Sequence, residues 1–403
     1  MKGAILVVGF NVRPLARSAK KAGYHVLAVD FWGDTDLSLW TDEYIAVLDQ
    51  QPRERPDRPQ IPTAEALVMG VQQILEDHGP VEYIVTSGGF DDHFESWKQL
   101  EKIGNLTGNS LEGMKRARNL HLTREVALRY GAEVPTTYEV TNQKQFESAT
   151  NHLDLPFLVK PLQGSGGFHS RVIRSESDIE RYNSHHHFST DVPILVQELI
   201  QGNDVSVSLL GTGNHAKSLS VNEQLIGLSE LGKGRTKAYC GNIVPLQAST
   251  ETISYLEMVS QGICEHLNLR GSNGIDYVID DSGTPYFMEI NPRIQATIEA
   301  IELVTNTNIV KLHVEATNGS LPRSTQKPQA VCARVIVYAR ESSRIPDLRN
   351  IPGVVDIPVP GSISNRGDPV CTVNHIAATR QEALLGAWEI VKTIYSHLEP
   401  TLT

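Results

Sequence analysis

The chain has 403 residues, of which 40% are hydrophobic and 21% are charged, so two or three domains with a sizeable core are expected. Its net charge of −11 argues against non-specific binding to nucleic acid or anionic membranes, because both require a basic surface. The four cysteines are scattered and form no Cys-x-x-Cys pair, which favours reduced, buried thiols over disulfides or a thiolate zinc site.

The first part of the chain alternates predicted strands with predicted helices. The strands are expected at 4–10, 25–30, 44–48 and 81–89, and the helices at 13–23 and 63–78. This alternation predicts a parallel, doubly wound α/β sheet for residues 1–110, whose ligands lie beyond the carboxyl ends of the strands. The segment GFNVRP lacks the dinucleotide fingerprint, and Asp30 is interpreted as the cap of the following turn rather than a ribose ligand.

Beyond residue 110 the pattern changes to helices and strand pairs, which indicates an α+β arrangement. Helices are expected at 111–134, 143–152 and 251–268, and strand–loop–strand units at 156–175 and 194–210. A polar, proline-containing link at 318–329 precedes a β-rich segment, 330–403, with a closing helix at 380–398. The segment SHHH at 184–187 is interpreted as a solvated turn rather than a metal cluster.

The stretch VKPLQGSGG predicts a phosphate-binding site. Lys160 ends an apolar strand and is followed by four small residues, Gly164, Ser165, Gly166 and Gly167. Glycines let backbone N–H groups approach an anion, and the lysine adds a positive charge. The lysine precedes the loop, so this is not a Walker loop. A plain hairpin turn is the alternative, but four small residues exceed what a tight turn needs.

The segment GIDYVIDDSGTPYFMEINPR predicts a β-hairpin that turns at DDSG. If Ser282 and Gly283 form its loop, Asp276 lies directly opposite Glu289, and Asn291 projects from the same face. Two facing carboxylates repel each other, and a hard divalent cation, Mg²⁺ or Mn²⁺, would remove the repulsion. The alternative is a register slip or a bulge that turns one carboxylate to solvent.

A third segment, LVQELIQGNDVSV, places Glu198 and Leu199 after an apolar strand and Asp204 at the start of the next. A surface hairpin explains this segment equally well when it is taken alone. Together, however, the three segments in this order resemble the ATP-grasp superfamily over most of the chain. The signature MEINPRIQ is similar to that of biotin carboxylase and carbamoyl-phosphate synthase. The N-terminal segment resembles a largely archaeal subgroup of predicted carboligases.

The resemblance implies a domain order and a set of ligands. The implied domains are a parallel α/β domain at 1–110, an ATP-grasp domain at 111–329 with a lid at about 135–200, and a small β-rich C-terminal lobe at 330–403. ATP and Mg²⁺ or Mn²⁺ are the implied cofactors. The implied nucleotide contacts are Lys160, the loop Gly164, Ser165, Gly166 and Gly167, the adenine hinge Gln197, Glu198, Leu199 and Ile200, and Asp204 on the ribose. The implied metal ligands are Asp276, Glu289 and Asn291, and the implied catalytic residues are Arg293, Lys160 and Arg334.

Two departures from the family pattern affect the expected chemistry. Asn119-Leu120 stands where the family has an Asp-Lys pair whose lysine reaches the phosphates. The basic residues that could substitute for it are Lys115, Arg118 and Arg124. Thr297 stands where biotin carboxylase has the glutamate that serves as bicarbonate base, with Glu299 nearby, which weakens a bicarbonate-fixing interpretation.

The resemblance implies an ATP-dependent carboxylate–amine ligase that works through an acyl phosphate and releases ADP and phosphate. The alternatives are a carboxylase that uses carboxyphosphate, a nucleotide-binding module without turnover and, more distantly, a nicotinamide oxidoreductase. We expect small-molecule carboxylate and amine partners, no nucleic-acid or membrane partner, and leave a homodimer open. No signal peptide or membrane-spanning run is recognised, so a cytoplasmic location is expected.

Overall fold

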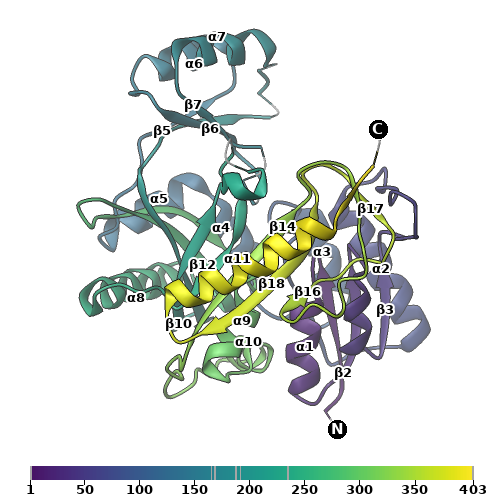
Figure 1. The fold of residues 1–403 in the computed structure, drawn as a ribbon. Helices are drawn as coiled ribbons and strands as arrows, with labels where there is room; N and C mark the ends of the chain where they lie inside the picture. The colour runs from purple at the N-terminus through teal and green to yellow at the C-terminus, as the bar shows by residue number, and fades with distance from the viewer. Residues whose placement is uncertain are drawn as a thin grey trace.

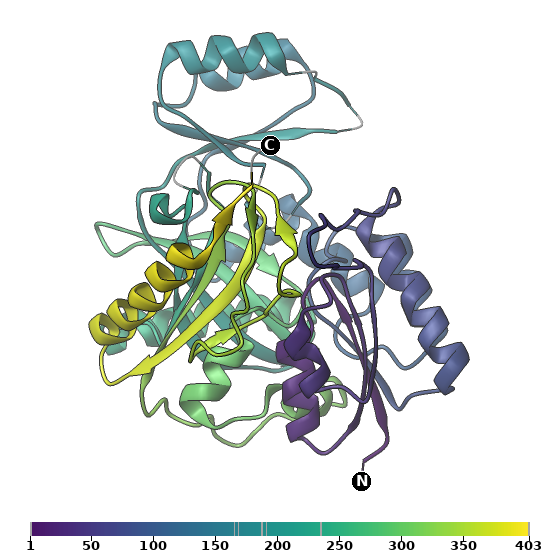
Figure 2. The ribbon, with the colours of Figure 1, turned by 45° about the vertical axis from the view of Figure 1, so that its right-hand side comes forward.

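The computed structural model describes residues 2–401 except 165, 168, 187, 191, 234 and 235. Figures 1 and 2 show an N-terminal part, a central part that includes the C-terminal strands, and a smaller segment that projects from the central part. Among the described helices, none is both long and apolar enough to cross a membrane.

The N-terminal part is built on a parallel four-stranded sheet in the order β3-β2-β1-β4, as the alternation of strands and helices predicted. Its elements are β1 (Ala4–Gly9), α1 (Arg13–Lys21), β2 (His25–Asp30), β3 (Glu43–Ala46), α2 (Thr63–His78), β4 (Tyr83–Thr86) and α3 (Phe94–Ile103). Alternate residues of β1 pack against α1 on one face and α2 on the other. Asp30 accepts hydrogen bonds from the N–H groups of Val12, Trp32 and Gly33, so its predicted role as a cap is confirmed.

The central part is an eight-stranded antiparallel sheet in the order β13-β12-β9-β10-β11-β14-β18-β16. Its strands are β9 (Gly202–Thr212), β10 (Ala216–Ile226), β11 (Tyr239–Val244), β12 (Arg270–Asp280), β13 (Pro285–Asn291), β14 (Val331–Tyr338), β16 (Val354–Val355) and β18 (Pro369–Ala377). Strands from both sides of the 318–329 link therefore share one sheet. Asn242 of β11, for example, pairs with Arg334 of β14.

The projecting segment, here called the lid, is a four-stranded antiparallel sheet covered by two helices (Figure 1). Its elements are β5 (Thr137–Val140), α6 (Gln143–Thr150), β6 (Phe157–Pro161), β7 (Arg171–Ile173), α7 (Glu176–His185) and β8 (Ile194–Glu198). The lid has a hydrophobic core of its own, in which Phe146 and Phe157 are fully buried. It can therefore be described as a separate packing unit.

The remaining elements lie against the central sheet and around the C-terminal strands. They are α4 (Leu111–Arg118), α5 (Leu120–Arg129), α8 (Thr250–His266), α9 (Ile298–Thr305), α10 (Ile309–Thr317), β15 (Ser343–Arg344), β17 (Ile363–Ser364), α11 (Arg380–His397) and β19 (Glu399–Pro400). The single helix expected at 111–134 is two helices. Asn119 leaves the helical conformation at φ −80° and ψ 105°, and its side chain caps α5 by accepting the N–H of Leu122.

The hairpin of β12 and β13 has the predicted pairing of Asp276 with Glu289 but not the predicted turn. The register shifts after Asp276, because Tyr277 pairs with Phe287 and Met288 forms a bulge. The loop has three residues and ends at Gly283, whose φ of 85° lies in the left-handed region. The observed loop is one residue longer than the predicted one, which shifts the pairing of Tyr277 by one residue. The extra residue at the bulge, Met288, cancels this shift, so Asp276 and Glu289 still face each other.

Candidate active site

Asp276, Glu289 and Asn291 come together at the end of the β12–β13 hairpin, as the sequence predicted. The amide of Asn291 donates to Asp276 Oδ2 at 2.8 Å. Burial and the neighbouring Glu289 raise the pKa of Asp276 to about 7. Its second oxygen, Oδ1, is buried and has no hydrogen-bond partner among the described residues. An orphaned carboxylate oxygen beside a second carboxylate and an amide fits a hard divalent cation such as Mg²⁺.

A cavity of about 310 Å³, here called the first cavity, lies between the lid and the central sheet. The predicted site residues that line it are Lys160, Gly164, Gly166, Gly167, Glu198, Leu199, Ile200, Asp204, Asp276, Glu289, Asn291 and Arg293. Gln197 does not line it, because its side chain is buried in the lid and donates to Thr137 Oγ1 at 2.9 Å. Ser165 lies outside the described residues.

Burial shifts the pKa values of two charged residues that line this cavity, Lys160 and Asp204, and a neighbour of opposite charge acts against each shift. Burial lowers the pKa of Lys160, while nearby Glu289 acts in the opposite direction. Burial raises the pKa of Asp204, whose carboxylate lies 3.6 Å from the Lys237 ammonium. Lys237 was not singled out from the sequence.

The glycine-rich loop is tied to the rest of the protein by backbone contacts. Gly167 adopts φ +67°, and a Cβ at this position would lie only 2.0 Å from the carbonyl oxygen of Lys237. The N–H of Gly164 donates to Asp92 of the N-terminal part at 2.8 Å. Gly167 is therefore required by this close approach of two backbones.

Among the three basic residues that could replace the absent lysine, Arg118 lines the first cavity. It forms a bidentate ion pair with Asp92 at 2.8 and 2.9 Å and donates to the carbonyl oxygen of Gly164 at 3.0 Å. Lys115 is exposed and pairs within its own helix, whereas Arg124 donates to a lid threonine. The side chain at 120, where the family lysine was expected, is a leucine that lines the cavity.

A second cavity of about 600 Å³ adjoins the first, between the carboxyl edge of the N-terminal sheet and the C-terminal strands. Arg293 lines both cavities. Its Nε donates to Asp91 Oδ1 at 2.7 Å and its Nη2 to Asn291 Oδ1 at 3.3 Å. Arg293 thus forms no ion pair with the glutamates of α9 and joins the cation cluster to the N-terminal part.

Three buried oxygen atoms on side chains that line the second cavity lack hydrogen-bond partners among the described residues. They are Asn11 Oδ1, Ser87 Oγ and Asp91 Oδ2. Burial acts to raise the pKa of Asp91, but Arg293 and Arg118 outweigh it and hold the pKa below its ordinary value. The carboxylate is therefore ionised, and this wall of the cavity presents hydrogen-bond acceptors.

Arg334 also lines the second cavity, but its guanidinium is held in a buried ionic network. It pairs with Glu299 at 3.2 Å and Asp356 at 3.1 Å, and both carboxylates also pair with Arg13. Asp36 lies 3.4 Å from Arg13 and Arg17 lies 3.7 Å from Glu299, so the arginines and acids of this network neutralise one another. This arrangement favours a positioning role for Arg334 over direct contact with a reacting group.

Residues 120–297 match the sequence model of the ATP-grasp domain. An uncharacterized protein of Methanocaldococcus jannaschii, MJ0776, is 28% identical over 91% of this chain and 87% of its own length. The solved L-amino acid ligase of Bacillus licheniformis superposes with a TM-score of 0.74 at 17% identity, covering 100% and 99% of the two chains. The biotin carboxylase domain of Hydrogenobacter thermophilus 2-oxoglutarate carboxylase gives 0.71 at 15% identity, covering 99% and 90%.

These matches agree with the geometry from which the site was built. The matched segment holds the cation cluster, Lys160, the glycine-rich loop and the lid, and the likeness to both solved structures extends through the N-terminal and C-terminal parts. The resemblance that the motifs implied is confirmed for the fold. Residues 120–297 are thus similar in sequence to the ATP-grasp domain, and the whole chain is similar in fold to the two solved enzymes.

Proposed function

We propose that the protein is an ATP-dependent ligase that joins a carboxylate to an amine through an acyl phosphate. The observation that carries the proposal is the position of Arg293 between two cavities. On one side are the cation cluster and Lys160, which suit a nucleotide; on the other are the unpartnered acceptors. The L-amino acid ligase of Bacillus licheniformis, with the same fold, supports this choice.

In the proposed reaction, a carboxylate oxygen attacks the γ-phosphorus of ATP and ADP leaves. An amine nitrogen then attacks the acyl carbon, phosphate leaves and the amine loses a proton. Mg²⁺ held by Asp276, Glu289 and Asn291 would neutralise charge on the phosphates. Lys160 and Arg293 supply fixed positive charge to the transferring group and its acceptor. The lid limits access of water, which would otherwise hydrolyse the acyl phosphate.

The amine partner is supported by the chemistry of the second cavity. Asn11 Oδ1 and Asp91 Oδ2 are acceptors that need N–H or O–H donors, because a buried polar atom without a partner is costly, and the Ser87 hydroxyl can accept as well as donate. An amine supplies several donors at one atom. Asp91 remains ionised in this structure and can also stabilise a protonated amine before it reacts.

A carboxylase that uses carboxyphosphate is the second candidate, because the biotin carboxylase domain shares the fold. Thr297 lines the first cavity where that family would place its base, and a hydroxyl is a poor substitute for a carboxylate base. Glu299 is not available as a replacement, because it is buried in the network with Arg13 and Arg334. These contacts favour the ligase.

The test is a screen of carboxylate and amine pairs for ADP release by the full chain, with and without bicarbonate. We expect ADP release that requires both an amine and a carboxylate, and its loss in Glu289→Gln. Release that needs bicarbonate and no other carboxylate would identify the carboxylase instead. ATP binding by calorimetry should require Mg²⁺ or Mn²⁺; equal affinity without the cation would contradict the metal assignment.

A further inference from the structure

Three potential metal ligands gather at the amino-terminal edge of the parallel sheet, at the opposite end of its strands from the second cavity. His25 begins β2, Glu43 begins β3 and His78 ends α2. Leu27 of β2 pairs with Glu43 and packs in the core beneath α2, so His25 and Glu43 project from the face that α2 covers. Helix α2 runs against the strand direction and therefore delivers its last residue to the same edge.

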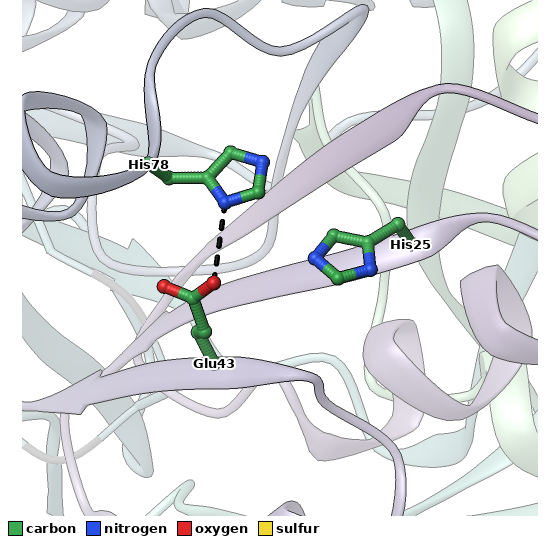
Figure 3. Close-up of side chains that lie close together, drawn as sticks. All are labelled: His25, Glu43 and His78. Atoms are coloured by element: carbon green, nitrogen blue, oxygen red, sulfur yellow. Dashed lines mark hydrogen bonds and ion pairs between the residues drawn. The ribbon is translucent and has the colours of Figure 1, made fainter.

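Figure 3 shows the three side chains pointing toward one another. One ligand atom from each lies within 4.8 Å of the other two. His78 Nδ1 is 3.2 Å from Glu43 Oε1, and the two imidazole rings stack with their centroids 5.2 Å apart. Metal–nitrogen bonds of about 2.0–2.1 Å need the atoms to draw closer, which rotations of partly exposed side chains allow.

The surroundings of His25 resemble those of a metal-bound histidine. Its Nδ1 lies 3.4 Å from Asp42 Oδ2, and Asp42 is itself held by the Lys20 ammonium at 2.7 Å and the Val26 N–H at 2.8 Å. A carboxylate at Nδ1 keeps the proton there and leaves a lone pair on Nε2. That Nε2 is buried and has no hydrogen-bond partner among the described residues, and Figure 3 shows it directed at the other two side chains.

We propose that His25, Glu43 and His78 bind a divalent transition-metal ion such as Zn²⁺. Two imidazoles and one carboxylate are a common zinc donor set, and the exposed side of the cluster leaves a fourth position for water. Mg²⁺ prefers oxygen ligands, so it belongs with Asp276 rather than here. Bound metal would link β2, β3 and the end of α2. The role is structural, and it does not depend on the proposed ligase activity.

The test uses the full chain, stripped of metal with a chelator, in a Glu289→Gln background that removes a carboxylate from the other cation cluster. Zn²⁺ is titrated against a chromogenic chelator, and thermal unfolding is followed with and without Zn²⁺. We expect one Zn²⁺ per chain and a higher Tm with Zn²⁺, because a ligand of the folded state stabilises it. Co²⁺ in place of Zn²⁺ should give visible absorption bands of a nitrogen- and oxygen-ligated ion.

Matched variants separate this site from adventitious binding. His78→Gln and Glu43→Gln should abolish the bound equivalent, the Tm shift and the Co²⁺ bands. Asp42→Asn keeps all three ligands and should weaken Zn²⁺ binding by roughly 10–100-fold, the cost of losing an orienting partner. His121→Gln, which changes an exposed histidine 3.8 Å from Glu139, should have no effect. Unchanged Zn²⁺ affinity in His78→Gln, or no bound Zn²⁺ in the parent chain, would overturn the proposal.

Discussion

Arg293 contacts two parts of the molecule with one planar group, because its Nε meets Asp91 and its Nη2 meets Asn291. Lysine cannot reproduce this geometry. We expect Arg293→Lys to keep ATP affinity within a few-fold while turnover falls by roughly 10²-fold or more. ATP calorimetry and steady-state rates on one preparation would measure both. Near-normal turnover would remove Arg293 from the proposed mechanism.

Lys160 and Lys115 offer a matched comparison of two lysines. Lys160 lines the first cavity near Glu289, whereas Lys115 is exposed and pairs with Glu112. Lys160→Ala should weaken ATP binding by about 1.5–3 kcal/mol, the range for a hydrogen bond to a charged group. Lys115→Ala should change it little. A larger loss in Lys115→Ala, measured by the same calorimetry, would place the phosphates elsewhere.

Among the secondary-structure elements, the parallel strands and the β12–β13 hairpin were predictable because their signals are local. Apolar runs fix buried strands, and an Asp-Asp-Ser-Gly turn fixes a hairpin to within one residue. The bulge at Met288 was not predictable, since it compensates a loop length that the sequence leaves open. Strands β10 and β11 were missed because their polar residues mix with apolar ones and give no clear period.

Helix α10 is docked on the central sheet through His313. The ring accepts the N–H of Ser272 at Nδ1, 2.9 Å away, and its Nε2 lies 3.1 Å from Thr107 Oγ1. Burial lowers the pKa of His313 to about 4. Between about pH 6.5 and about pH 4 the unfolded chain therefore binds more protons than the folded one, and stability falls as pH falls.

We expect His313→Gln to flatten this part of the pH dependence, because glutamine does not take up a proton. Urea unfolding at about pH 7 and about pH 5 would compare the variant with the parent and with His152→Gln, which changes an exposed histidine. If the parent loses no more stability on acidification than His313→Gln does, the histidine is not the group responsible.

In the whole molecule, Arg13 of α1 joins three distant segments by pairing with Glu299 of α9 and with Asp356 near the C-terminal strands. Burial opposes ionisation of Asp356, but Arg13 and Arg334 hold its pKa below the ordinary value. Arg13→Met removes one cation from two buried carboxylates, leaving Arg334 and the more distant Arg17, and should cost about 3–5 kcal/mol of unfolding free energy. Urea unfolding would measure it, with exposed Arg349→Gln as the control; a loss below about 1 kcal/mol would contradict it.

Some parts of the candidate sites could not be predicted from the sequence, because they depend on contacts between residues that lie far apart along the chain. Asp92 reaches Arg118 and the glycine-rich loop across 26 and 72 residues, and no local pattern relates these positions. Likewise, the histidines of the segment 184–187, of which residue 187 lies outside the described residues, are neighbours in sequence, whereas His25 and His78 meet only because a sheet and a helix bring them together. Motif spacing therefore predicts site residues within one hairpin or loop, whereas site residues from different elements can be recognised only in the folded structure.

The sheet that continues from β11 into β14 also affects how the chain responds to a protease. The 318–329 link is polar and largely exposed, so a cut there is accessible. The two fragments would nonetheless remain one particle, because Asn242 and Arg334 belong to a paired ladder and Arg13 is ion-paired with Asp356. A nicked sample should elute from a sizing column as the intact protein does and separate only in denaturant.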